Sequence, residues 1–448
     1  MKTVIFGANN RGCMIATSLF EDHDVSIIDK TENITDDFYK LDIEIIAGNV
    51  IDPDVLTSAG ITGSDVFVAC SDDDEMNILA CTVVKALCSA KTVCFLKDEI
   101  YVKALETLKE TEKSKFVFAD FIINPKVLLT NELFRIITVP DATNVENFAD
   151  GKARMLVYPV KEKSNLADKK IKDVKFPKNT LIVGITDENG LFIPDGETVL
   201  KINDRAIFMG TKNSLNELAE KFFNERKNVK SVVIIGGGTI GCRLAEILER
   251  HGISPKIIEK NHERCEEISR ILLKTLVING DGTDVQLLRT EEIEDSDVVV
   301  SVTDNDEKNL LASLLAKQSG VKKVISRVVN EHNIRLFEKV GIDVAVSEND
   351  AAVHEINVNF VQTDISILAT VARGQGEVIE VFLPGEFQSC KIMDLKMPHK
   401  AIIAIIERKG DVIVPNGETV IYPCDNLIIF TMEEYSSAIK KYLFGHKA

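Results

Sequence analysis

The sequence contains no tryptophan and no apolar run close to the ~20 residues that a helix needs to cross a bilayer. Any role at a membrane is therefore expected to depend on a membrane-spanning partner. An apolar strand pattern begins directly after Met1 and Lys2, without the features of a signal peptide. We therefore expect a cytoplasmic protein.

Positive charge is scarce relative to negative charge. The chain has 53 Lys and Arg against 70 Asp and Glu, which gives a net charge of −17. Binding to nucleic acid or to anionic lipid requires concentrated Lys and Arg, so neither partner is expected. The acidic surface is most simply a means of staying soluble.

Patterns typical of metal and disulfide frameworks are also missing. The nine cysteines form no Cys-x-x-Cys pair, and the seven histidines show no His-x-His or His-x-x-x-His spacing. Cys70 and Cys94 lie inside apolar runs, as buried core cysteines do. We therefore expect neither a structural zinc site nor a disulfide scaffold.

The chain is an internal repeat with an offset of about 230 residues. The matches keep their order and nearly constant spacing, so the two halves are copies of one unit. The matched features are Gly7 with Gly236, Asp29 with Glu259, Asn49 with Asp281, the run 71–77 with 303–309, and Pro194–Thr198 with Pro415–Thr419.

The first part of each half alternates short apolar strands with helical patterns. The strands expected in the first copy cover residues 3–6, 25–28, 43–46, 66–69 and 92–96, and the second copy repeats them between 232 and 325. Near-continuous β-branched strands separated by helices indicate a parallel sheet covered on both faces. The fold class is therefore α/β, with two tandem Rossmann-like domains.

The second part of each half is expected to be a small α+β lobe. Strand-like runs at 206–209 and 427–430 follow Pro/Gly turns, and helical patterns at 215–223 and 433–443 end each lobe. The charged stretch 225–230 is interpreted as a linker. The domains expected are 1–138 and 231–362 for nucleotide binding, and 139–225 and 363–448 for the C-terminal lobes.

The strongest functional pattern is the Gly-x-Gly-x-x-Gly turn at residues 236–241. Gly236 permits a tight turn, Gly238 lets the backbone approach a pyrophosphate, and Gly241 allows close packing of helix on strand. The following helix presents free N–H groups to the phosphates. Glu259 ends the next strand, where a carboxylate binds ribose hydroxyls and repels a 2′-phosphate, which favours NAD(H) over NADP(H).

The turn of the first half is less complete. Gly7 and Gly12 are kept, but Asn9 replaces the middle glycine, and its side chain takes space that a pyrophosphate would use. Asn also tolerates positive φ, so the turn itself can survive. Asp29 keeps the ribose-binding position, and Arg11 is either a phosphate contact or a solvated residue of the first helical turn.

Acidic runs follow the fourth strand of each half. Residues 72–75 and 304–307 are read as helix starts whose carboxylates complement the helix dipole, with a metal site as the alternative. Ser71 and Thr303 stand at the ends of strands, where open α/β sheets bind ligands. We therefore expect both to lie near a bound nucleotide.

The order of these motifs resembles the RCK domains, also called KTN domains, that regulate potassium conductance. Two such domains in one chain, each with a small lobe carrying Pro-x-Gly-x-Thr, resemble the TrkA family of peripheral subunits of Trk potassium-uptake systems. The resemblance covers essentially the whole chain. It implies NAD(H) and adenine nucleotides such as ATP or ADP as ligands. From the residues themselves we expect no catalytic and no metal-binding site.

The resemblance also implies the residues of two pockets. In the second half they are Gly236, Gly237, Gly238, Thr239, Ile240, Gly241, Glu259, Asp281, Thr303, Asp304 and Arg327. In the first half they are Gly7, Ala8, Asn9, Asn10, Arg11, Gly12, Asp29, Asn49, Ser71 and Asp72. The first half departs from the pattern at Asn9, and it has no arginine near Leu96, where Arg327 would align.

The partners implied are a Trk-type transmembrane potassium channel or transporter subunit and further copies of this chain, as a tetramer or a dimer of dimers. The protein would sit on the inner face of the cell membrane, touching it only through that partner. Two alternatives remain open, which are an NAD-dependent oxidoreductase and the regulatory subunit of a potassium/proton antiporter. No His, Lys or Tyr stands out as a catalytic acid or base for the oxidoreductase.

Overall fold

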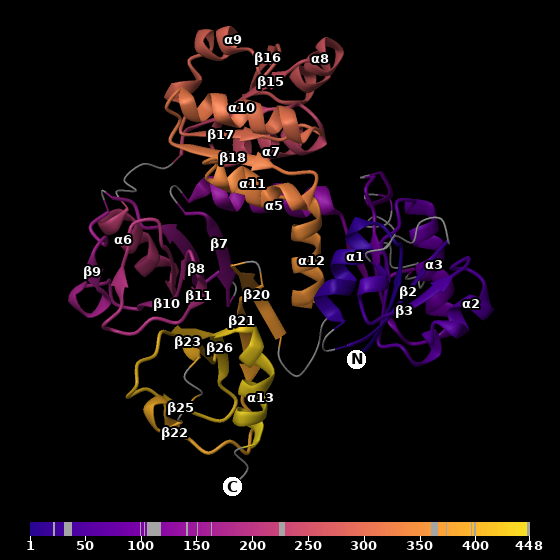
Figure 1. Ribbon diagram of the computed structural model, residues 1–448, viewed down its shortest axis with the longest axis vertical. Coiled ribbons are helices and arrows are strands. Elements are labelled where there is room, and N and C mark those ends of the chain that lie inside the picture. The colour runs from indigo at the N-terminus through magenta and orange to yellow at the C-terminus, as the bar shows by residue number, and fades with distance from the viewer. Residues whose placement is uncertain are drawn as a thin grey trace.

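Each half begins with a six-stranded parallel sheet (Figure 1). The computed structural model describes residues 1–20, 23–30, 38–98, 100–102, 104, 118–139, 142–149, 151–162, 164–223, 229–359, 366–372, 374–395, 397 and 400–445. Most of the expected linker, residues 225–228, lies outside this set.

The first sheet has the strand order β3-β2-β1-β4-β5-β6, as in dinucleotide-binding folds. Its strands are β1 (Lys2–Phe6), β2 (Asp24–Asp29), β3 (Glu44–Ala47), β4 (Val66–Ala69), β5 (Lys91–Phe95) and β6 (Phe121–Ile123). The helices are α1 (Asn10–Leu19), α2 (Pro53–Ser58), α3 (Asp74–Leu87) and α5 (Pro125–Thr138). Ile5 and Val4 belong to separate apolar clusters, one with α1 and one with α2 and α3, so both faces are covered.

The second sheet repeats the order as β16-β15-β14-β17-β18-β19. Its strands are β14 (Ser231–Ile235), β15 (Ser254–Glu259), β16 (Leu276–Asn279), β17 (Val298–Ser301), β18 (Lys323–Arg327) and β19 (Val344–Val346). The helices are α7 (Thr239–Arg250), α8 (His262–Ile271), α9 (Val285–Thr290), α10 (Asp306–Gln318), α11 (Ile334–Lys339) and α12 (Glu348–Asn359). The duplicated α/β fold inferred from the repeat is confirmed.

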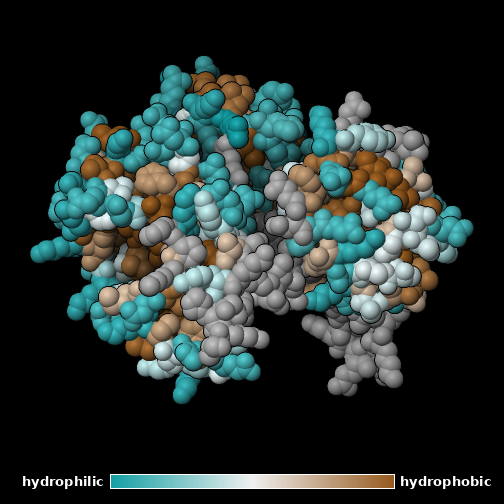
Figure 2. All heavy atoms as spheres, turned by 60° about the horizontal axis from the view of Figure 1, so that its bottom comes forward, coloured by the Kyte–Doolittle hydropathy of each residue, from teal (hydrophilic) through white to brown (hydrophobic). Residues whose placement is uncertain are grey.

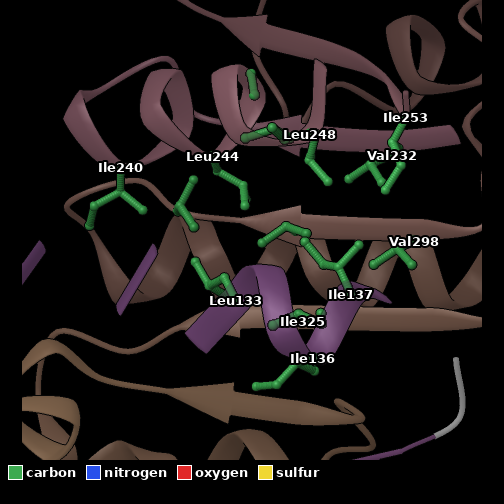
Figure 3. Packing of buried hydrophobic residues seen from close by; sticks show 14 of the residues in the cluster. Leu133, Ile136, Ile137, Val232, Ile240, Leu244, Leu248, Ile253, Val298 and Ile325 are labelled. Carbon is green, nitrogen blue, oxygen red and sulfur yellow. The ribbon is translucent and has the colours of Figure 1, made fainter. Parts of the chain in front are cut away.

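The two halves exchange helices. Leu133 and Ile137 of α5, in the first half, pack against Leu244 of α7 and the second sheet (Figure 3). In return, Ala352 and Ile356 of α12 complete the apolar cluster of α1 in the first half. Each nucleotide domain therefore buries a helix that follows the sheet of the other.

The C-terminal lobes are antiparallel sheets with one long helix each. The first contains β7 (Asn144–Phe148), β8 (Ala153–Pro159), β10 (Thr180–Asp187), β11 (Gly190–Phe192) and β13 (Arg205–Thr211), with α6 (Lys212–Phe222). The second contains β20 (Ser366–Val371), β21 (Gly376–Phe382), β23 (Ala401–Arg408), β24 (Asp411–Ile413) and β26 (Asn426–Met432), with α13 (Ser436–Gly445). A two-stranded ribbon accompanies each, β9 (Lys169–Lys170) with β12 (Val199–Leu200) and β22 (Cys390–Lys391) with β25 (Val420–Ile421).

The two lobes pack against each other through one apolar cluster. It joins Met155 and Ile207 of the first lobe to Ile405 and Phe430 of the second. Contact is close, because a Cβ added at Gly184 would lie 2.9 Å from the ring of Phe430. The chain is thus joined to itself twice, by exchanged helices and by facing lobes (Figure 1).

Hydrophilic residues cover much of the face drawn in Figure 2, and apolar residues gather on its right-hand side, where Figure 1 places the first nucleotide domain. That domain exposes the large apolar side chains of Tyr39, Leu79 and Leu87. None of the described helices is long and apolar enough to cross a membrane.

Candidate nucleotide-binding sites

The glycine turn of the second half has the geometry that its spacing predicts. Gly236 adopts a φ of +110°, which L side chains rarely adopt. A Cβ on Gly241 would lie 2.0 Å from the carbonyl oxygen of Gly236. A Cβ on Gly238 would meet no atom within 4 Å, so this position faces open space. Helix α7 begins after Gly238, and no side chain caps its start. No side chain therefore accepts a hydrogen bond from its first backbone N–H groups.

Glu259 holds this turn from the end of β15. Its Oε2 accepts a hydrogen bond of 2.7 Å from the backbone N–H of Gly237, and its Oε1 accepts one of 2.7 Å from Asn261. Arg264 donates from Nε to the carbonyl of Gly237 at 2.8 Å. The turn is therefore fixed from both sides before any ligand arrives.

Asp281, after β16, is held ionised by its neighbours. Its Oδ2 accepts from Lys260 Nζ at 2.9 Å, and its Oδ1 accepts from the Thr283 hydroxyl at 2.7 Å and the Thr283 N–H at 3.0 Å. The hydrogen bond from Lys260, followed by those from Thr283, holds the pKa of this carboxyl far below its ordinary value. It is thus a charged acceptor at the edge of the site.

A buried asparagine ties the ends of two strands together. Asn309, fully buried, accepts at Oδ1 from the hydroxyl (2.7 Å) and N–H (2.9 Å) of Thr303, and donates to the carbonyls of Thr303 and Arg327. It fixes the backbone at both site residues. The repeated motif contained this signal, because Asn77 makes the same contacts with Ser71 and Phe95 in the first half.

Arg327 lies between two carboxylates. One amino group pairs with Asp304, and the other lies 2.7 Å from Oε1 of Glu348 at the start of α12. A guanidinium in this position can bind ligand phosphate in place of a carboxylate.

These groups surround a cavity of about 350 Å³, within the usual range for a ligand site. It is lined by every residue expected for the second site except Gly237 and Gly241, which shape the turn from behind. The sequence did not single out five of the polar residues that line it, which are Lys126, Lys260, Thr283, Asn305 and Lys308.

The first turn has the same backbone but a closed helix end. Gly7 has a φ of +122°, and a Cβ on Gly12 would lie 1.9 Å from the Gly7 carbonyl oxygen. Asn9 is extended, with φ −100° and ψ 179°, so its tolerance of positive φ is not needed. Its Oδ1 caps α1 by accepting from the Gly12 N–H at 2.9 Å, and its amide donates to the Cys70 carbonyl at 2.8 Å.

The other residues expected in the first site are held mainly by protein partners. Asp29 accepts from the Ala8 N–H at 2.6 Å, and Asn49 accepts from the Ile51 N–H at 3.2 Å. Asp72 pairs with Lys97, and Asn10 donates to Glu331 of the second half at 3.2 Å. Glu259, Asp281 and Asp304 make comparable contacts with protein groups in the second half, so the feature that sets the first turn apart is the cap by Asn9.

Arg11 is not a solvated residue. Its side chain lies over the ring of Phe95 at 5.1 Å, and its Nε donates to Oδ1 of Asn349 in α12 at 3.2 Å. The strand registers align Phe95, one residue before Leu96, with Arg327, because Ile123 and Val346 pair opposite them. The position that matches Arg327 is therefore Phe95, next to Leu96, and Arg11 brings a guanidinium to this region from α1 instead.

Two protein-family models each match this chain twice, once in each half. The TrkA-N domain model matches residues 3–125 and 232–348, and the TrkA-C domain model matches 155–222 and 391–443. The chain belongs to the TrkA family. "Trk system potassium uptake protein TrkA homolog 2" of Methanosarcina mazei is 35% identical, over 98% of this chain and 99% of its own length. "Trk system potassium uptake protein TrkA" of Halomonas elongata is 30% identical, over 97% and 96%.

Solved structures similar to this TrkA-family chain share its fold. The "Crystal Structure of the GsuK RCK domain" superposes with a TM-score of 0.61 at 19% identity, over 99% of this chain and 95% of that one. The "GsuK channel bound to NAD" gives the same TM-score and identity, over 99% and 79%. The resemblance to tandem RCK domains is thereby confirmed at the level of fold.

The acidic runs of the TrkA-family motif serve the helices that follow. Asp73 and Asn305 cap α3 and α10, by accepting from Met76 and Lys308 at 2.9 and 2.8 Å. Asp74 and Asp306 bind backbone N–H groups beyond the next strand. Within the described part of the chain, no group of three or more His, Cys, Asp or Glu is placed to hold a metal ion.

Proposed function

We propose that this TrkA-family chain is a nucleotide-sensing regulatory subunit of a Trk-type potassium-uptake system, and that its second half holds the principal NAD(H) or adenine-nucleotide site. The observation that carries the proposal is the uncapped start of α7, which opens beside Gly238 into a cavity also lined by Glu259 and Arg327. The corresponding end of α1 is closed by Asn9. We therefore assign the first half a weaker site or none.

The chemistry of the cavity fits such a ligand. Free N–H groups at the start of α7 would bind the pyrophosphate, and Glu259 would accept hydrogen bonds from ribose hydroxyls. Asp281 would lie near the base or the far ribose, and Arg327 would bind phosphate charge. ATP, ADP and NAD(H) all carry the ribose and phosphates that these groups recognise.

Arg327 would connect a ligand in the second-half cavity to helix α12, because it also contacts Glu348. A phosphate bound by Arg327 would compete with Glu348, the first residue of α12. Helix α12 packs on α1 of the first half, and its second residue, Asn349, accepts from Arg11. Ligands with unequal affinity for two arrangements of α12 would shift their populations, and the shift can be no larger than that difference in affinity.

The membrane partner is proposed from the family. Relatives that match nearly the whole chain are named Trk system potassium uptake proteins, and a neighbour of the same fold is a channel bound to NAD. We propose that the chain docks on the inner face of the cell membrane through a transmembrane Trk-type subunit, as a homo-oligomer. It would divide into two nucleotide domains, 1–138 and 231–362, and two lobes, 139–225 and 363–448.

Potassium uptake in cells that lack this protein tests the function. The native chain should restore uptake, and a Gly238→Asp variant should change it, because a carboxylate at the open turn repels pyrophosphate and fills its space. The matched control is Asn9→Asp, which places a carboxylate at the same position of the first turn, where a side chain already caps the helix.

Two outcomes would contradict the proposal. If uptake does not depend on the protein, the potassium assignment fails, and the oxidoreductase alternative is tested with substrate screens. If Gly238→Asp is abundant and folded yet indistinguishable from the native chain, the second cavity is not the regulatory site.

A further inference from the structure

One wall of the second-half cavity comes from the first half. Lys126, the second residue of α5, lines the cavity together with Gly238, Glu259 and Arg327. Lys126 lies 110 positions before Gly236 in the chain, and it belongs to the helix that the first half lends to the second. The cavity is therefore assembled from both halves.

The packing of α5 explains how Lys126 reaches the cavity. Figure 3 shows α5 and α7 running side by side in the same direction, with Leu133 toward Ile240 and Ile137 farther along. The starts of the two helices therefore lie at the same end, where the glycine turn opens. Lys126 is about two helical turns before Leu133, which brings it to that end.

The ammonium of Lys126 is available to a ligand. Among the described residues, no hydrogen bond or ion pair engages its side chain, and the group is half-buried. Of the other cations of the cavity, Lys260 is paired with Asp281 and Arg327 with Asp304 and Glu348, whereas Lys308 is exposed and, like Lys126, has no ion pair among the described residues. A cation without a counter-ion at the wall of the cavity favours an anionic ligand group.

Beside the turn of the first half, the position that matches Lys126 holds an uncharged residue. The strand registers match Asn349 of α12 with Lys126 of α5. Lys126 comes three residues after Ile123, which pairs with Phe95. Asn349 comes three residues after Val346, which pairs with Arg327. Asn349 is already engaged, accepting from Arg11 at 3.2 Å and donating to Glu331 at 2.6 Å. The two exchanged helices thus bring different chemistry to the two turns.

We propose that Lys126 binds a phosphate of the nucleotide in the second-half cavity, so that the ligand is held by both halves at once. This inference rests on the proposed function of the cavity. It adds that bound phosphate fastens α5 to the glycine turn. Nucleotides would then strengthen the contact between the halves, and adenosine, which has no phosphate, would not.

Calorimetric titration of the full-length protein with ADP and with adenosine tests the inference. The Lys126→Met variant should lose about tenfold or more in affinity for ADP, the usual cost of removing a charge-assisted hydrogen bond. Its affinity for adenosine should stay at the native value. Lys126→Arg keeps the charge and should retain most of the affinity for ADP.

The control is Lys169→Met in β9, an exposed lysine of the first C-terminal lobe, which should bind both ligands as the native chain does. If Lys126→Met binds ADP as tightly as the native chain, the inference is wrong and the proposed function stands. An equal loss of ADP and adenosine affinity would also overturn it, because it would point to a distorted cavity. If the native chain binds neither of these ligands nor NADH, the proposed function fails together with the inference.

Discussion

At the scale of single residues, the two glycine turns differ mainly in one side chain. Asn9 accepts from the Gly12 N–H and so closes the start of α1, whereas Gly238 leaves the start of α7 open. Both residues are extended, so the difference lies in hydrogen bonding and not in backbone strain. A nucleotide at the first turn would have to displace the side-chain amide of Asn9, and the loss of that amide's hydrogen bonds would weaken binding.

Two glycines of the second turn, Gly241 and Gly238, are predicted to respond differently to a methyl group. Gly241→Ala would place a Cβ 2.0 Å from the Gly236 carbonyl oxygen. It should lower the free energy of unfolding by on the order of 2 kcal/mol or more, and the melting temperature with it. Gly238→Ala meets no atom within 4 Å and should leave the melting temperature nearly unchanged. Thermal melting of the two variants beside the native chain measures this. Equal melting temperatures for the two variants would show that Gly241 is not confined as described.

At the scale of elements, the positions of strands were easier to predict than the elements against which each helix packs. The β-branched runs placed β1, β2, β4 and β5 within a residue or two, because buried parallel strands have to be apolar throughout. Strands β6 and β19 were missed because each has three residues, too few for a pattern. Helix α5 was not predicted, and the periodicity of apolar residues can show that a helix is buried but not which element it packs against.

The residues of the candidate site also differ in how far the sequence could predict them. Glycines and carboxylates close to the turn in sequence could be found by spacing, whereas Lys126 could not, because only the exchange of α5 brings it to the cavity. Arg327 was found through the family pattern, and the position expected near Leu96 to match it is the adjacent Phe95.

Helix α5 also carries an acid whose ionisation should be visible in stability. Burial, and then the charge of Glu146, raise the pKa of the Glu132 carboxyl to about 7, against the opposing effect of Arg135. The folded state then holds a proton that the unfolded state releases near pH 4.5, so stability should fall as pH rises from about 5 to 8. Glu132→Gln should flatten that fall and melt at higher temperature than the native chain at about pH 8.

Melting temperatures across this pH range test the prediction. Glu220→Gln, an exposed position of α6, is the control and should follow the native curve. If Glu132→Gln and the native chain show the same slope, Glu132 is already charged in the folded protein.

At the scale of the whole molecule, the exchanged helices make the two nucleotide domains interdependent. Co-expressed fragments 1–139 and 229–359 should co-purify without their C-terminal lobes, because each supplies a helix to the core of the other. Leu133→Asp in the first fragment should abolish this, since it places a charge in the cluster around α7. Leu79→Asp, at an exposed leucine of α3, is the control.

Co-purification can be measured with a tag on one fragment. If the Leu133→Asp fragment remains bound to its partner, the exchanged helices are not what holds the domains together. If the unmodified fragments fail to associate, the lobes are required to join the halves.

The exchange of α5 has a consequence for synthesis on the ribosome. Translation delivers residues 125–138 well before α7 and β18, the elements that cover Leu133 and Ile137. A nascent first half therefore carries an uncovered apolar helix while the rest of the chain is made, and such a surface binds chaperones or a neighbouring nascent chain. Folding of the first half is completed only when residues up to α12 have emerged, so the order of the two halves along the chain sets when either can function.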